Sequence, residues 1–93
     1  MKRAMIIHRE DSVAVAADSV LCGEEVYYEA EGHRTVLIAA TDIPVYHKLA
    51  VREIHKGERV IKYGCTIGIA LEEIPAGAHV HIHNMRSEGA GNG

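Results

Sequence analysis

The sequence contains no tryptophan or phenylalanine, and its aromatic content of 4% comes from four tyrosines. With 47% hydrophobic residues, the chain has to build its core from aliphatic side chains. A chain of 93 residues forms one small domain. A core of that size gives only modest stability, so a partner surface would add to it.

Long apolar runs are also absent, and none approaches the ~20 residues of a membrane helix. The segment Ala4–Ile7 behind the basic N-terminus is too short for the apolar region of a signal peptide. Acidic and basic residues are interspersed at a net charge of −3, without a basic run that favours nucleic acid. These absences predict a cytoplasmic protein with neither a membrane nor a nucleic-acid partner.

The chain has only two cysteines, Cys22 and Cys65, and neither belongs to a CxxC pair. Without export signals, buried free thiols are favoured over a disulfide. Gly64 and Gly68 flank the second cysteine, but their spacing does not match a phosphate-binding loop or a dinucleotide-binding fingerprint. The sequence also shows no arrangement typical of nucleophilic catalysis.

An internal repeat, Ala-x-x-x-(Ile/Val)-x-x-Gly-x-x-Val, occurs at residues 16–26, 50–60 and 70–80. Alanine and Ile/Val four residues apart can share one face of a helical turn. The glycine suits a left-handed residue that ends the turn, and the valine begins a strand. The units are too short and too irregularly spaced for a solenoid. The repeat predicts one compact β-rich domain with short helical turns.

Strand-like composition is found at residues 4–7, 13–16, 26–30, 35–39 and 59–63. The third and fourth of these segments predict a hairpin around a turn at residues 31–34. No long amphipathic helix is predicted. Residues 87–93 carry no apolar pattern and are expected to form a flexible tail, so that the domain occupies residues 4–86.

Three of the seven histidines alternate with apolar residues in His79-Val80-His81-Ile82-His83. In an extended strand the histidines would share one face, with Val80 and Ile82 facing the core. Imidazole is the commonest metal ligand and the usual proton carrier near neutral pH. Along such a strand, neighbouring residues on one face have Cα atoms ~6.5–7 Å apart, and those of His79 and His83 would be ~13 Å apart. At most two of the three histidines would therefore bind one ion. A solvated histidine face is the alternative.

A second cluster, His47 and Lys48, follows a proline-containing break and can provide acid/base and anion-binding groups. An ordinary polar loop is the alternative. Lys62 and Tyr63 form a third candidate, although the lysine would equally face water and the tyrosine pack. The remaining histidines fall in predicted polar turns and are expected at the surface: His8, His33 and His55.

Several motifs occur in a fixed order along the chain: residues 11–16 (DSVAVA), 47–50 (HKLA), 60–64 (VIKYG), 67–70 (IGIA) and 79–84 (HVHIHN). Together they resemble the N-terminal SAF-type domain of the altronate dehydratase/galactarate dehydratase family over residues 4–86. The resemblance implies a mainly β fold of the β-clip (SAF-like) type. Members of this family are sugar-acid hydro-lyases that use a divalent metal, typically Fe²⁺. A relative that acts on sulfolactate carries the small domain as a separate subunit.

The resemblance implies that the chain is the small subunit or N-terminal SAF domain of a metal-dependent sugar-acid dehydratase. It would act with a large catalytic subunit on a sugar-acid or hydroxy-acid substrate. The small subunit of (2R)-sulfolactate sulfo-lyase and a non-catalytic ligand-binding or assembly module are the alternatives, and homo-oligomerisation stays open. The implied site has catalytic groups at His47 and His81, metal ligands at His81 and His83, and substrate-binding groups at Lys48, Lys62 and Asn84.

The chain departs from the family pattern at two positions. Family members usually have glycine before the His-Lys pair, where this chain has Tyr46. They often have asparagine where this chain has Ser12. A tyrosine there would narrow a pocket or alter a loop, which leaves the substrate open. We expect the large catalytic portion to come from a separate subunit, unless the chain is a stand-alone or excised domain.

Overall fold

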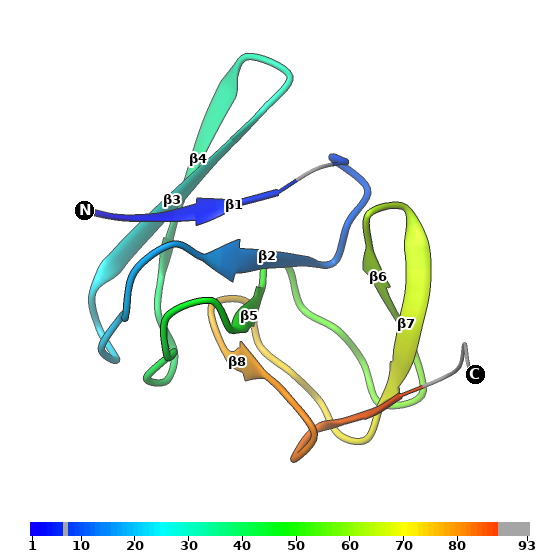
Figure 1. The fold of residues 1–93 in the computed structure, drawn as a ribbon. Helices are drawn as coiled ribbons and strands as arrows, with labels where there is room; N and C mark the ends of the chain where they lie inside the picture. The colour runs from blue at the N-terminus through cyan, green and yellow to red at the C-terminus, as the bar shows by residue number, and fades with distance from the viewer. Residues whose placement is uncertain (7, 88–93) are drawn as a thin grey trace.

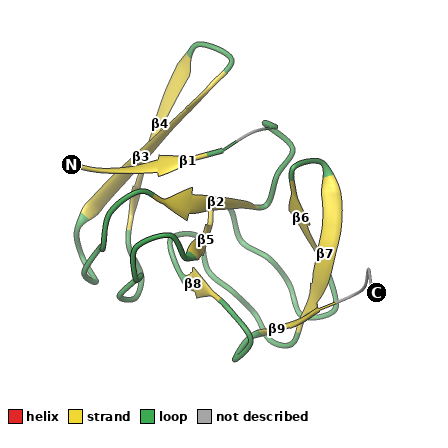
Figure 2. Cartoon of the chain, viewed as in Figure 1, coloured by secondary structure: helices red, strands yellow, loops and turns green. Residues whose placement is uncertain are grey.

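The computed structural model describes residues 1–6 and 8–87, and every regular element among them is a β-strand (Figures 1 and 2). The mainly β fold predicted from the sequence is therefore confirmed. No helix in the described part of the chain has the length and apolar content to cross a membrane. The strands are β1 Lys2–Met5, β2 Val13–Ala16, β3 Glu25–Ala30, β4 His33–Ile38, β5 Lys48–Ala50, β6 Arg59–Lys62, β7 Cys65–Ala70, β8 His79–Val80 and β9 Met85–Ser87.

The strands form two sheets. Six strands make a sheet of order β4-β3-β1-β2-β5-β8, and the others make a sheet of order β6-β7-β9. Neighbours are antiparallel except for β1 and β3, which run parallel. Figure 1 shows the β3–β4 hairpin extending away from the rest of the molecule, while β6 and β7 lie on the other side of β2. Ile7, which ends the first predicted strand, and residues 88–93 of the predicted tail lie outside the described residues.

The β3–β4 and β6–β7 hairpins each have a two-residue loop in which both residues have a left-handed backbone. The predicted hairpin is confirmed, with the turn narrowed to Glu31 and Gly32 at φ 52° and 81°. Tyr63 and Gly64 connect β6 to β7 at φ 56° and 74°. Two positive φ values in a two-residue loop correspond to a type I′ turn, whose twist matches that of the strands. The sequence did not predict β7. Gly64 directly before this strand and Gly68 within it lower the strand propensity of the segment.

The structure contains a fourth copy of the repeat at residues 39–49, in which Tyr46 takes the glycine position and Leu49 the final valine position. In each copy the backbone N–H at the glycine position donates to the carbonyl of an alanine in another copy, at 2.7–2.8 Å. The alanine, Ile/Val and final positions of all copies are buried: Ala16, Val20, Val26, Ala39, Ile43, Leu49, Ala50, Ile54, Val60, Ala70, Ile74 and Val80.

The four copies build two similar halves. Residues 16–26 and 39–49 contribute to one core cluster, and residues 50–60 and 70–80 contribute to the other. An isolated β-bridge joins the copies within each half, Val20 to Ile43 and Ile54 to Ile74. The helical turn predicted in each copy is therefore wrong. The backbone of the Ile/Val residue in each copy bonds to the Ile/Val residue of the other copy in its half, and these long-range bonds replace the local bonds of a helical turn.

The glycines of the three copies found in the sequence are left-handed as predicted, at φ 85–91°. The prediction of free cysteines is confirmed, but Cys22 and Cys65 are exposed rather than buried. The aliphatic repeat positions fill both cores, so the turn that carries Cys22 stays at the surface, where its thiol contacts the Ala40 carbonyl at 3.3 Å. Asp11 and Ser12, both 1% exposed, fasten the β1–β2 connection to the β6–β7 hairpin.

Tyr46 has a left-handed backbone at φ 67°, which costs a non-glycine residue about 1 kcal/mol. We expect Tyr46→Gly to raise the free energy of unfolding by about that amount, measured by urea denaturation. The matched variant Gly77→Ala occupies the same repeat position in the other half. There a Cβ would collide with the Ile38 carbonyl, so we expect a loss of about 2–3 kcal/mol. A destabilised Tyr46→Gly chain would contradict the strain at this residue.

Candidate functional site

Four histidines gather where β5 and β8 lie side by side (Figure 1). His47 immediately precedes β5, His79 opens β8, and His81 and His83 follow in the next turn. The ring centroids are 5.1 Å apart for His47 and His79, and 4.8 Å for His47 and His81. The His79 ring lies 5.5 Å from that of His81 and 5.3 Å from that of His83. The structure therefore joins two of the predicted clusters into one.

The extended histidine row predicted from the sequence is wrong beyond Val80. β8 ends there, and the amides of Asn84 and Met85 both donate to the His81 carbonyl, at 3.1 and 2.9 Å, which closes a turn. Ile82, predicted to face the core, is 76% exposed. Because the chain turns, the His79 and His83 rings lie far closer than the ~13 Å of an extended strand. Strand spacing therefore no longer sets the limit of two ligands per ion. The limit itself still holds among the described residues, because the three histidines do not form a group whose donor atoms all lie within 4.8 Å of one another.

Asn84 explains why the chain turns at this point. Its side chain is 4% exposed, and the Oδ1 atom accepts a hydrogen bond from the His81 amide at 3.0 Å. The Nδ2 atom donates to the His79 carbonyl at 2.8 Å. Asparagine side chains that bond nearby backbone groups stabilise turns in this way. Asn84 thus holds the backbone between two of the clustered histidines, and its contact with substrate stays a prediction.

His47 and His79 are joined directly, with 2.9 Å between Nδ1 of His47 and Nε2 of His79. Burial, together with the charges of the other three imidazoles and of Lys48, lowers the pKa of His79 to about 4. His79 is therefore neutral near pH 7, and its backbone N–H is fixed by the Thr41 hydroxyl at 2.9 Å. The sequence analysis counted His79 among the possible metal ligands, but the site implied by the family resemblance did not include it. The pairing of His47 with it, across 32 residues, has no local sequence signal.

Two lysines add positive charge to the same region. Lys48 is half-buried in β5, and burial followed by the charge of Lys62 lowers its pKa. Lys62, on β6, places its Nζ 4.6 Å from the centre of the Tyr63 ring. Within residues 1–6 and 8–87, neither lysine forms an ion pair with a carboxylate. A cationic region without acidic partners attracts an anion, such as a carboxylate.

The imidazole donors fit a first-row divalent metal by chemical type. However, among the described residues the group of three potential ligands with donor atoms within 4.8 Å of one another lies elsewhere, at Glu53, His55 and Glu73. That group is exposed at the surface, and the hydrogen bond that His55 makes to the Glu73 carboxylate raises the pKa of His55. The role of His81 and His83 as metal ligands therefore stays a prediction.

Comparison with known proteins gives a family match over nearly the whole chain. The profile described as the altronate/galactarate dehydratase SAF domain matches residues 2–88. An altronate dehydratase of Escherichia coli is 46% identical over 81 residues, covering 87% of this chain and 16% of that protein. An altronate dehydratase from Bacillus subtilis is 31% identical over 87 residues, and the match covers 94% of this chain and 17% of that protein. The chain therefore spans about a sixth of the altronate dehydratases that it matches.

A second kind of relative has nearly the same length as this chain. The protein named (2R)-sulfolactate sulfo-lyase subunit alpha, from Chromohalobacter salexigens, is 33% identical over 87 residues. The match covers 89% of this chain and 93% of that subunit. The similarity thus extends both to one domain of long enzymes and to a whole small subunit.

Proposed function

The chain belongs to the altronate/galactarate dehydratase SAF-domain family, and from that premise we propose that it is the small subunit, or N-terminal domain, of a metal-dependent sugar-acid dehydratase. In this proposal a large catalytic subunit completes the active site. The observation that carries the proposal is the cluster of four histidines beside two lysines without carboxylate partners. Such a cluster has proton carriers and anion-binding groups, and the chain spans only about a sixth of the altronate dehydratases that it matches.

The reaction removes the proton α to a carboxylate and expels the β-hydroxyl group as water. Lys48 and Lys62 bind the substrate carboxylate and draw charge away from the α carbon. His47 and His81 carry the protons, one taken from carbon and one delivered to the leaving hydroxyl. Asn84 adds a substrate contact in this proposal, besides holding the turn between His79 and His81.

A divalent metal, Fe²⁺ by analogy with the family, would be held by His81 and His83 together with ligands from outside this chain. When bound, the metal supplies a Lewis acid for the oxygens of the substrate. His79 keeps the neighbouring His47 ring in place through their shared hydrogen bond. The histidine turn is held by its own asparagine, so its backbone is ordered before any ligand arrives.

Carbon–sulfur cleavage is the second candidate, because the sulfolactate sulfo-lyase subunit matches this chain over 93% of its own length. The same α-proton removal would expel sulfite instead of water. The lysine pair suits either substrate, since both carry a carboxylate. Only a measurement of the released products, water or sulfite, therefore distinguishes the two candidates.

The test combines the purified chain with its separately purified cognate large subunit. Altronate, galactarate and (2R)-sulfolactate are supplied in turn, and the keto-acid product and released sulfite are measured. We expect the chain alone to be inactive and the pair to dehydrate a sugar acid. Release of sulfite would select the second candidate. Robust dehydration by the chain without a partner would overturn the small-subunit proposal.

A further inference from the structure

Two exposed tyrosines have left-handed backbones, which is unusual for large side chains. Tyr46 is 72% exposed at φ 67°, and Tyr63 is 53% exposed at φ 56°. In the described part of the chain, the only other non-glycine residue with positive φ is Glu31. We therefore ask which contact of the tyrosine side chains would offset the unfavourable backbone conformation at these two positions.

The fold itself does not need tyrosine at either position. Gly77 makes the same turn as Tyr46 in the other half of the molecule, with equivalent backbone hydrogen bonds. Glu31 takes the same place as Tyr63 in the other hairpin, each directly before a left-handed glycine. The described residues give neither tyrosine hydroxyl a hydrogen-bond partner. At Tyr63 the backbone is held by Asp11 and the ring lies under Lys62, whereas the Tyr46 side chain is 72% exposed. Strain at an exposed side chain such as that of Tyr46 points to a function outside the chain.

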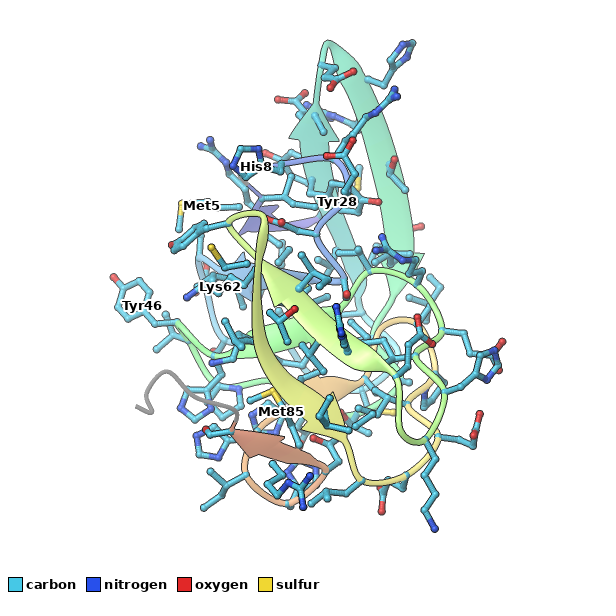
Figure 3. The ribbon with its side chains drawn as sticks, turned by 90° about the vertical axis from the view of Figure 1, so that its right-hand side faces the viewer. Met5, His8, Tyr28, Tyr46, Lys62 and Met85 are labelled. Carbon is cyan, nitrogen blue, oxygen red and sulfur yellow. The ribbon has the colours of Figure 1, made fainter. Side chains whose placement is uncertain are left out.

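Both tyrosines border the proposed site. Tyr46 directly precedes His47, and the Tyr63 ring lies under the Nζ of Lys62. Strand register places Met5 opposite Val15 and Val15 opposite Lys48, so the 44%-exposed Met5 shares a face with the lysine. Figure 3 shows Met5, Lys62 and Tyr46 projecting on one side of the molecule. We call Met5, Tyr46 and Tyr63 the tyrosine face.

We propose that the tyrosine face is the surface on which the large catalytic subunit docks, with Tyr46 and Tyr63 as its anchors. The inference rests on the proposed function and names the surface that completes the site. Exposed tyrosine and methionine are typical of the centres of protein interfaces. The altronate dehydratases that match this chain are about six times as long, so most of such an enzyme lies outside the matched domain.

A protein partner fits these tyrosines better than a small substrate does. Tyr46 extends away from the body of the molecule in Figure 3, and it is 72% exposed. A substrate held by the lysines and imidazoles would leave such a side chain in water. A subunit that covers the tyrosine face would bury both rings and exclude water from the site between the two chains.

The test uses Tyr46→Gly and Tyr63→Asn, because both replacements favour the left-handed backbone and keep the turns. The matched control is Glu31→Asn, the same exchange in the other hairpin. Titration calorimetry with the separately purified cognate large subunit measures the Kd. We expect each tyrosine variant to weaken binding more than about tenfold and the control to bind as the wild type does. Circular dichroism should show unchanged folding of all three.

The possible results separate this inference from the proposed function. Wild-type affinity in both tyrosine variants overturns the docking surface while the enzyme assignment stands. Unchanged Kd with a KM raised more than about tenfold also overturns it, since the tyrosines would then contact substrate. A wild-type pair that neither associates nor turns over substrate overturns the proposed function, and the docking surface with it.

Discussion

Replacing Asp11 by alanine is expected to lower the free energy of unfolding by about 3–5 kcal/mol. The carboxylate of Asp11 is 1% exposed and accepts hydrogen bonds from the backbone amides of His8, Tyr63 and Gly64, at 3.3, 3.0 and 2.9 Å. Alanine would remove the acceptor of these three part-buried hydrogen bonds, and a hydrogen bond to a charged group contributes about 1.5–3 kcal/mol. The total free energy of unfolding of a small domain is about 5–15 kcal/mol, so much of the stability of this domain depends on Asp11.

Urea denaturation of Asp11→Ala measures the loss directly. Asp18→Ala provides the matched control, because its carboxylate is exposed and, within residues 1–6 and 8–87, accepts a hydrogen bond only from the adjacent Ser19 amide. The control should change the free energy of unfolding by less than about 1 kcal/mol. Equal effects of the two substitutions would contradict the role of Asp11 as the link between the β1–β2 connection and the β6–β7 hairpin.

The same carboxylate makes stability depend on pH. Burial by itself raises the pKa of Asp11, but the hydrogen bonds from Gly64, Tyr63 and His8 outweigh it and lower the pKa below its usual value. Because the folded pKa lies below the unfolded one, the contribution of Asp11 is complete above about pH 4. It is lost as the pH falls through the folded pKa. The Asp11→Asn chain should therefore show a flatter loss of stability in acid than the wild type.

Replacing His47 or His81 by alanine is expected to lower turnover by the assembled enzyme by about 10²–10⁴-fold. Both rings lie within the histidine cluster, 4.8 Å apart, and the proposal gives them the proton transfers. Neither residue belongs to the tyrosine face, so the Kd for the large subunit should stay at its wild-type value. Steady-state kinetics at saturating small subunit separates the loss of turnover from a loss of assembly.

His33→Ala is the control for these substitutions, since His33 is exposed at the start of β4 and belongs to the projecting hairpin. Its turnover should match that of the wild type. If His47→Ala and His81→Ala assemble and also retain full turnover, the chain is a non-catalytic assembly module and the histidine cluster has no catalytic part.

Much of the fold follows from the repeat. Its glycines are left-handed and its valines lie in strands, as the spacing predicts, because those two positions depend on local backbone conformation. The fourth copy was not found, since Tyr46 replaces the glycine that marks the others. The helical turn was wrongly predicted because a spacing of four residues does not reveal the long-range bridges, such as Val20 to Ile43, that replace it.

The site was predictable only in part. The alternating histidines predicted a cluster, but the turn that forms it depends on both ends of the Asn84 side chain, which period-2 alternation hides. The hydrogen bond between His47 and His79 depends on the pairing of β5 with β8. Contacts of that kind arise from sheet topology and leave no local pattern in the sequence.

The central claim is that this chain forms one wall of an active site shared with a large subunit. Its most direct test measures the turnover of the large subunit as the chain is titrated into it. We expect no turnover from either component alone, a rise that saturates at equimolar chain, and no such rise with a chain carrying both His47→Ala and His81→Ala. Full turnover by the large subunit without the chain, or with the doubly substituted chain, would contradict it.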